Sequence, residues 1–470
     1  MEKSQEDLPY FKIFPKYLAS VAPGQTVEFD NITCYHSIKL STVKLNLQEI
    51  ELTIEHNEAD NILCHRSFVV TTGSFVQVKE VFGNGAHTFV LTSDGSPEQD
   101  WDLFERGPRV FVHQTSPEDL TYKIGATFAL FEAEFTMEVP QLVADMNREF
   151  MKSYIGIDME PRGANAPEIL DIPEHLIQDG DTFNIIRLNG LAPMIAWAMG
   201  AATGHTVVAL WREDRLYLCE STTVSECWPT NGIQCNPYST WVEWARKADM
   251  HAVWAPLDRK PGAPTMDRNK AWDLVDKLVG NDYGYEVVLM GWLDTIKDNL
   301  PCVKDRELSD FCLEAETFEL LFAYIQRVSF AAARVFVPAV QQRAGVPFNS
   351  TLLQAYYNAH LNGVEPTQIF SITEKDGWLY ETTRDGKPVV SYSMVCNVFV
   401  CNVWKAGGLF NDTDVNCGDS SVNDNYKLKM YQDPELRPDI CKEMDPENPL
   451  CQITGRYSLR LDSEPGVLPR

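Results

Sequence analysis

Residues 391–409 have the sequence SYSMVCNVFVCNVWKAGGL, and they place a cysteine at the start of an expected helix. Apolar side chains recur at helical spacing over residues 395–404, which predicts a helix with one face in a core. Ser393 can cap its N-terminus, and the glycines at 407–408 can end it. Cys396 then lies in the first turn, where free backbone N–H groups and the helix dipole favour a thiolate. Cys396 is therefore a candidate nucleophile if a histidine can reach it.

A candidate histidine lies far upstream, where Gly204 and His205 precede an apolar run over residues 206–211. This pattern predicts a glycine turn that enters a buried strand. A second strand is expected at 216–220 after a short polar turn, and the two strands would form a hairpin. Glu220 could then lie beside His205. A base, an orienting acid and a thiol at a helix N-terminus form a Cys-His-acid set.

The composition favours a folded, acidic protein. The chain has 470 residues, 44% of them hydrophobic and 11% aromatic, and this length suggests about two to four domains. The net charge of −27 argues against nucleic acid or an anionic membrane surface as the main partner. Charged residues interrupt the most apolar stretch, at 318–340, so we expect no stable membrane insertion.

The cysteines indicate disulfides. Ten of the twelve cluster along the chain and could form five disulfides, which would leave Cys219 and Cys396 free. The connectivity stays open at this stage. No CxxC pair occurs, so we expect no structural zinc site. We also expect no cofactor. The clustered cysteines are the near pairs Cys34 and Cys64, Cys227 and Cys235, and Cys302 and Cys312, followed by Cys401, Cys417, Cys441 and Cys451.

Cysteine usage favours an oxidising compartment. Sequons at Asn31, Asn349 and Asn411 are compatible with a glycoprotein. The first seven residues lack the apolar core of a signal peptide. We therefore expect a secreted or lysosomal protein whose leader is absent from this sequence, with a cytoplasmic protein as the alternative.

The patterns along the chain predict an α+β protein with three parts. Residues 1–160 are expected to form a non-catalytic, sandwich-like β-domain whose partner is unknown, because short strands alternate with turns there. A linker at 161–167 leads to a domain over 168–411, with a helical insertion at about 305–365. A polar tail at 412–470 is expected to depend on disulfides. The predicted strands of the first part are 42–47, 50–54, 68–72, 75–78 and 87–91, and helices are predicted over 271–300 and 306–343.

The second part resembles a known family. The helix ending at Gly200, the His205 strand, the strand ending in Glu220 and the Cys396 helix resemble the circularly permuted branch of the NlpC-type papain-like cysteine hydrolases. Asp179-Gly180-Asp181 and the sequence KAGGL at 405–409 are part of this resemblance. The branch includes lecithin–retinol acyltransferase relatives, and its histidine strand precedes the polar partner and the cysteine helix, as here. The resemblance covers roughly residues 175–240 and 390–410.

The resemblance implies a role for each of three residues. Cys396 would be the nucleophile, His205 the general base and Glu220 the third polar residue. Tyr283 and Tyr285 lie in a segment similar to one that often precedes the cysteine helix in permuted members, and they would line the cleft. The helical insertion would sit in or over the site.

Each residue also has a structural interpretation. Cys401 lies roughly 140° around the helix from Cys396, so we expect it to be structural. Cys219 would point to the face opposite Glu220 and into the core. Glu226 is the alternative third member, and the aromatic residues over 228–244 are expected to pack a short helix.

Three functions stay open. The first is a hydrolase that cleaves amide or peptide bonds through an acyl thioester on Cys396. The second is a lipid thioesterase or acyltransferase. The expected substrate is therefore a peptide for the first function and an acyl compound for the second. The third is an inactive binding protein.

Overall fold

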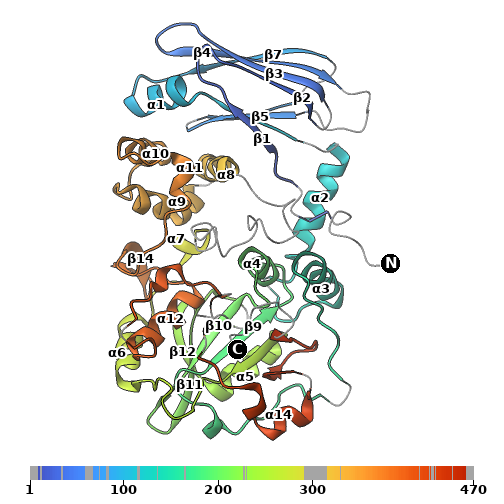
Figure 1. The fold of residues 1–470 in the computed structure, drawn as a ribbon, viewed down its shortest axis with the longest axis vertical. Coiled ribbons are helices and arrows are strands. Elements are labelled where there is room, and N and C mark those ends of the chain that lie inside the picture. The colour runs from blue at the N-terminus through green and yellow to red at the C-terminus, as the bar shows by residue number, and fades with distance from the viewer. Residues whose placement is uncertain are drawn as a thin grey trace. The chain divides into compact units, whose positions relative to one another are not determined.

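A computed structural model divides the chain into two compact units (Figure 1). Phe128–Cys312 and Thr373–Arg470 form the first, here called the cysteine unit. Pro9–Thr127 and Leu313–Ile372 form the second, here called the sandwich unit. The structure describes the chain except residues 1–8, 11–12, 33–34, 59–66, 74, 81–83, 114–116, 135, 164–165, 226–227, 229, 291–314, 329, 412, 423, 425–427, 429, 447 and 462–470.

The sandwich unit contains two four-stranded antiparallel sheets, as its alternating sequence predicts. One sheet has the order β1 (Lys16–Ser20), β8 (Arg109–Val112), β5 (Ser67–Thr72) and β6 (Phe75–Glu80). The other has the order β2 (Thr26–Ile32), β3 (Tyr35–Lys44), β4 (Glu49–Glu58) and β7 (Gly85–Thr92). Leu40 and Leu52 of one sheet and Val70 of the other belong to one buried core. Four of the five predicted strands are therefore confirmed, whereas the one predicted over 42–47 is the end of β3, which stops at Lys44.

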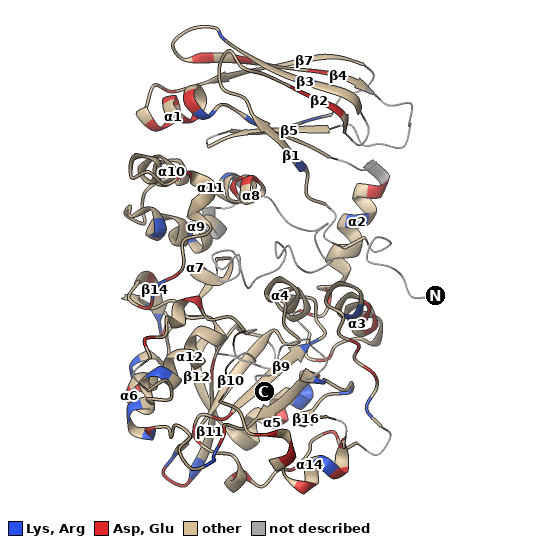
Figure 2. Cartoon of the chain, in the orientation of Figure 1, with Lys and Arg blue, Asp and Glu red and all other residues tan. Residues whose placement is uncertain are grey.

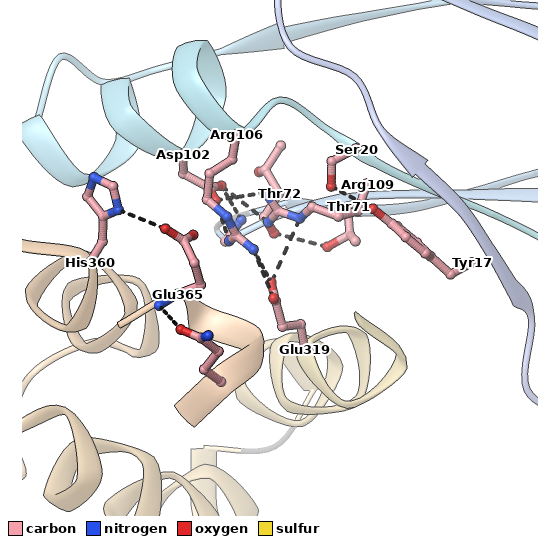
Figure 3. A network of polar contacts seen from close by, with 12 residues as sticks. Tyr17, Ser20, Thr71, Thr72, Asp102, Arg106, Arg109, Glu319, His360 and Glu365 are labelled. Atoms are coloured by element: carbon pink, nitrogen blue, oxygen red, sulfur yellow. Dashed lines mark hydrogen bonds and ion pairs between the residues drawn. The ribbon is translucent and has the colours of Figure 1, made fainter. Parts of the chain in front are cut away.

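A helical segment belongs to the sandwich unit as well. It contains α8 (Ala315–Val328), α9 (Phe330–Ala344), α10 (Leu352–Leu361) and α11 (Pro366–Ile369). Glu319 of α8 accepts two hydrogen bonds from Arg106, at 2.8 and 2.9 Å. Arg106 ends the π-helix η2 (Asp102–Arg106), and Asp102 also accepts from Arg109 at 2.7 Å (Figure 3). The sequence predicted an insertion of the catalytic domain here, whereas these buried ion pairs join the segment to the sandwich.

The cysteine unit is built on a six-stranded antiparallel sheet, so the mixed α+β class is as predicted. Along β9, Phe183 and Ile185 face a core with α5 (Tyr238–Lys247), and Ile186 faces a core with α3 (Gln141–Ile155) and α4 (Leu191–Met199). α12 (Cys396–Ala406) contacts β10, β11 and α6 (Arg268–Leu278). The sheet order is β12 (Gly232–Pro237), β11 (Arg215–Thr222), β10 (His205–Arg212), β9 (Thr182–Arg187), β13 (Met250–Ala255) and β16 (Cys451–Thr454).

Some boundaries differ from the predicted ones. The first unit boundary falls at 127–128, within α2 (Pro117–Ala129), and the expected linker at 161–167 lies inside the cysteine unit. The helix predicted over 271–300 ends at Leu278. Val279 after it has an extended backbone, and Gly280 has a positive φ of 86°. A short helix, α7 (Tyr285–Val288), comes next.

The C-terminal tail is part of the cysteine unit. Its strand β16 pairs with β13, and the disulfide Cys441–Cys451 ties that strand to α14 (Asp439–Met444). A second disulfide, Cys401–Cys417, ties α12 to the start of the tail. The expected dependence on disulfides therefore has a structural basis. Across the described ranges, no helix has the length and apolar character needed to cross a membrane.

Candidate active site

The cysteine helix begins at Cys396 itself. Val395 is the N-cap residue and supplies no side-chain cap, and the C-cap residue is Gly407. The prediction that Ser393 caps the helix is wrong, because its hydroxyl donates to Glu286 at 2.7 Å instead. Cys396 is 5% exposed, and it is the free cysteine of the described residues, as predicted. Its thiol therefore lies at the positive end of an eleven-residue helix.

The predicted hairpin brings the base and the acid together. β10 begins at His205 and pairs antiparallel with β11, with Val208 opposite Cys219. In this register, Val207 and Glu220 point to the same face as His205, because side chains alternate along a strand. The distance from His205 Nε2 to Glu220 Oε2 is 2.7 Å.

Two tryptophans hold the acid. Trp228 Nε1 donates to Glu220 Oε1 at 2.7 Å, and Trp241 Nε1 donates to the same oxygen at 2.9 Å. The Glu220 carboxylate is 1% exposed, so its rotamer is fixed by these indoles and by His205. The sequence pattern predicted only a packing role for the two tryptophans. A buried indole N–H needs a hydrogen-bond partner, and this requirement points from the tryptophans to a nearby acceptor such as Glu220.

The histidine ring joins the acid to the thiol. Its Nε2 lies 2.7 Å from Glu220 Oε2, and the Cys396 side chain lies close enough to the ring to raise the pKa of His205. Burial by itself disfavours the charged ring, but Cys396 and then Glu220 outweigh it and raise the pKa of His205 to about 10. The arrangement thus stabilises the protonated form of His205.

A third segment lies beside the start of α12. Gly284 donates its N–H to the Met394 carbonyl at 3.1 Å, and a Cβ on Gly284 would come within 2.5 Å of the Met394 backbone. Only glycine permits this approach. Burial, and then the charge of Cys396, raise the pKa of the neighbouring Tyr283 well above its ordinary value. The Tyr283 phenol therefore keeps its proton close to the thiol, whereas Tyr285 donates to Asn231 at 3.0 Å.

The remaining cysteine predictions have mixed outcomes. Cys219 is not free but is disulfide-bonded to Cys235 on the adjacent strand, because the two residues are opposite in the β11–β12 register. The predicted division of the cysteines is therefore wrong for Cys219 and correct for Cys396. Cys401 is structural, as predicted. Outside the described residues lie Cys34, Cys64, Cys227, Cys302, Cys312 and the alternative acid Glu226.

Nothing in the described ranges groups three or more His, Cys, Asp or Glu side chains as a metal site. Comparisons of the chain with protein-family models, curated proteins and solved structures found no match. The chemistry of the site therefore follows from the residues Cys396, His205 and Glu220 themselves.

Proposed function

We propose that the cysteine unit is a thiol hydrolase that cleaves amide or peptide bonds through Cys396, His205 and Glu220. His205 takes the thiol proton, and the thiolate attacks the substrate carbonyl carbon. The C–N bond then breaks as the imidazolium gives its proton to the leaving amine, and an acyl thioester remains on Cys396. His205 next takes a proton from water, and the resulting hydroxide displaces the thiolate and releases the acid. These steps need no cofactor.

One observation carries this proposal: the Glu220 carboxylate is oriented before any substrate arrives. Two indole N–H groups occupy one of its oxygens, and the other contacts His205. A histidine–glutamate pair that served only the fold would need no free thiol on the other edge of the ring. Cys396 lies close enough to this ring to raise the pKa of His205, and it belongs to no disulfide.

Charge that develops on the substrate oxygen needs hydrogen-bond donors. The Cys396 backbone N–H lies at the open end of α12, and the protonated Tyr283 phenol lies near the same sulfur. We assign these two groups to the oxyanion. Loss of one such donor typically costs about 10²–10³ in kcat.

The order of the three residues supports a permuted papain-like architecture. The hairpin with His205 and Glu220 comes first, and the helix that starts at Cys396 comes last in the unit. We therefore propose membership of the NlpC-type permuted branch. The three described disulfides are compatible with an extracellular location, and we propose a secreted or lysosomal protein.

A second candidate function is that of a lipid thioesterase or acyltransferase, and the surroundings of Cys396 favour it. Cys396 belongs to an apolar cluster that includes Met199 and Ile195 of α4. That helix carries no charged residue (Figure 2). An apolar acyl chain would fit beside these apolar side chains. The two candidate functions therefore differ in the acyl group of the substrate, which is a peptide carbonyl in the first and a lipid acyl chain in the second.

The test is a pH series of alkylation with iodoacetamide followed by peptide mapping. The wild type should label at Cys396 rapidly near pH 5–6, because a thiolate paired with an imidazolium persists below the range of an ordinary thiol. His205→Ala should lose this low-pH labelling. His36→Ala, which removes an exposed histidine of the sandwich unit, is the matched control and should label as the wild type does.

Substrate class follows from mass spectrometry of the intact protein after incubation with peptide amides and with acyl esters. An acyl mass on Cys396 that is absent from Cys396→Ala supports the hydrolase, and the acyl donor that produces it separates the two candidates. Labelling of Cys396 only above about pH 8, in wild type and His205→Ala alike, would instead favour the inactive binding protein.

A further inference from the structure

A second cavity lies in the cysteine unit, away from Cys396. Its volume is about 610 Å³, within the range of about 300–1,000 Å³ that is usual for small-molecule sites. The walls are the turn over 175–181, Trp211 near the end of β10, and the loop over 257–268 that leads into α6. His205 begins β10, so six strand positions, roughly 20 Å, separate it from Trp211. The cavity is therefore distinct from the proposed catalytic site.

Two arginines in the cavity wall are held by aspartates. Arg259 donates to Asp181 at 2.6 Å, and Arg268 donates to Asp179 through Nε at 2.8 Å. A guanidinium carries five N–H groups, so each arginine keeps donors that these contacts do not use. Such an arginine is oriented in advance and loses little freedom when it binds a ligand oxygen.

The Asp181 carboxylate is a fixed support. It is fully buried, and it accepts from the Leu257 backbone at 2.9 Å and from Trp254 Nε1 at 3.1 Å in addition to Arg259. Burial raises the pKa of Asp181 to about 6, and the charge of Arg259 opposes this shift. At neutral pH the Asp181 carboxylate is ionised, and its hydrogen bond with Arg259 fixes the position of the guanidinium.

The charges of the wall favour an anion over a cation. The oxygens of Asp179 and Asp181 are already bonded to arginine and backbone donors, so a bound cation would have to compete with those contacts. Asp258 also lines the cavity, and its carboxylate accepts from the Lys260 backbone. The exposed Lys260 side chain adds a third cation to the wall.

An apolar part completes the lining. Trp211 and Met266 face the cavity beside the charged groups, and Met266 also packs against Gly407 at the end of α12. Ligand sites commonly combine such apolar walls with a few well-placed polar groups. The lining thus suits a ligand with one anionic end and one apolar end.

We propose that this cavity binds a small ligand through a carboxylate or phosphate group, which Arg259, Arg268 and Lys260 recognise. Arginine is suited to both groups because its planar fork matches two oxygens at once. This inference does not depend on the proposed hydrolase activity.

The test is calorimetric titration of the full chain at pH 7.5 with inorganic phosphate and, separately, with succinate, at constant ionic strength. The wild type should bind at least one of the two anions saturably. Arg268→Gln should weaken that binding about 10–100-fold, since it removes hydrogen bonds that a charged donor makes to the anion. Lys260→Gln leaves both arginine–aspartate pairs intact and should weaken the same binding.

Arg212→Gln is the matched control. Arg212 is exposed to a similar extent as Arg268, pairs with Asp276 at 2.6 Å and does not line the cavity. Binding that this variant retains and that Arg268→Gln and Lys260→Gln lose supports the site. Absence of saturable binding of both anions to the wild type overturns the proposal, and so does equal loss in all three variants. Neither outcome bears on Cys396, whose alkylation is measured separately.

Discussion

Replacement of Glu220 by glutamine tests how the site prepares its thiol. The amide has nearly the size of the carboxylate, and the indoles of Trp228 and Trp241 will hold its oxygen, because both are N–H donors. The amide NH₂ then faces His205 Nε2. That nitrogen must accept, so the neutral ring carries its proton on Nδ1, the position that has to receive the proton of Cys396.

The size of the effect follows from the lost charge. The His205 Nε2 to Glu220 Oε2 distance is 2.7 Å, which places the two charge centres close together. Unit charges about 4 Å apart interact by about 4 kcal/mol at an effective dielectric constant of about 20. At about 1.4 kcal/mol per pH unit, removal of the carboxylate should lower the pKa of His205 by about three units from about 10. The thiolate–imidazolium pair should become about 10³-fold less populated.

The assay is the rate of Cys396 alkylation by iodoacetamide at about pH 6, resolved by peptide mapping. Glu220→Gln should react about 10³-fold more slowly than wild type there, and the two rates should converge at alkaline pH, where an ordinary thiol ionises. Glu243→Gln is the control, because Glu243 lies on α5 beside Trp241 but pairs with Arg246. Wild-type reactivity of Glu220→Gln at pH 6, in a folded protein, would refute the role assigned to Glu220.

Three further predictions concern stability. Removal of the Cys219–Cys235 disulfide by alanine at both positions should lower the free energy of unfolding by about 3 kcal/mol, given a sequence separation of 16, and an unchanged urea midpoint would contradict this. Glu319→Gln removes the charge of the buried carboxylate that pairs with Arg106 and should cost about 3–5 kcal/mol by calorimetry; a melting temperature equal to that of wild type would argue against the ion cluster. Burial lowers the pKa of His251 to about 3, so the unfolded state takes up a proton first, and the free energy of unfolding should fall as the pH drops from about 6.5 towards 3. His251→Gln should flatten that decline, and an equally steep decline in the variant would be inconsistent with this origin.

The local elements of the site follow closely from sequence, because they depend on neighbouring residues. Alternation fixes which face of the hairpin carries Glu220, and the helical period together with the glycines after residue 406 fixes the Cys396 helix. The N-cap residue of the Cys396 helix could not be predicted from neighbouring residues in this way. Ser393 has a hydroxyl of the kind that caps helices. That hydroxyl instead donates a hydrogen bond to Glu286, which lies more than a hundred residues away in sequence. A tertiary contact thus overrides a local preference.

The contacts that complete the site depend on register and on distant partners. The Cys219–Cys235 bond requires β12 to lie beside β11 with those residues opposite each other, and spacing along the chain does not reveal this. The helical segment over 313–372 shows the same limit. Its amphipathic pattern predicts helices, but contacts between distant residues, such as the hydrogen bonds between Glu319 and Arg106, show that those helices belong with the sandwich strands.

One carbonyl explains how the parts of the site keep their positions. The Met394 oxygen, two residues before Cys396, accepts from the Ser221 hydroxyl at 2.7 Å and from the Gly284 N–H at 3.1 Å. Ser221 follows Glu220 on β11, so the strand that carries Glu220 also holds the backbone that leads into Cys396. Gly284 likewise follows Tyr283. The segments that carry Glu220, Tyr283 and Cys396 therefore all meet at the Met394 carbonyl. This holds although the chain passes through the sandwich unit between Tyr283 and Cys396. A shared contact of this kind keeps the three side chains in fixed relative positions. Preorganised catalysis requires such positions, because a displacement of a reacting group by about 1 Å can lower the rate about 10²-fold.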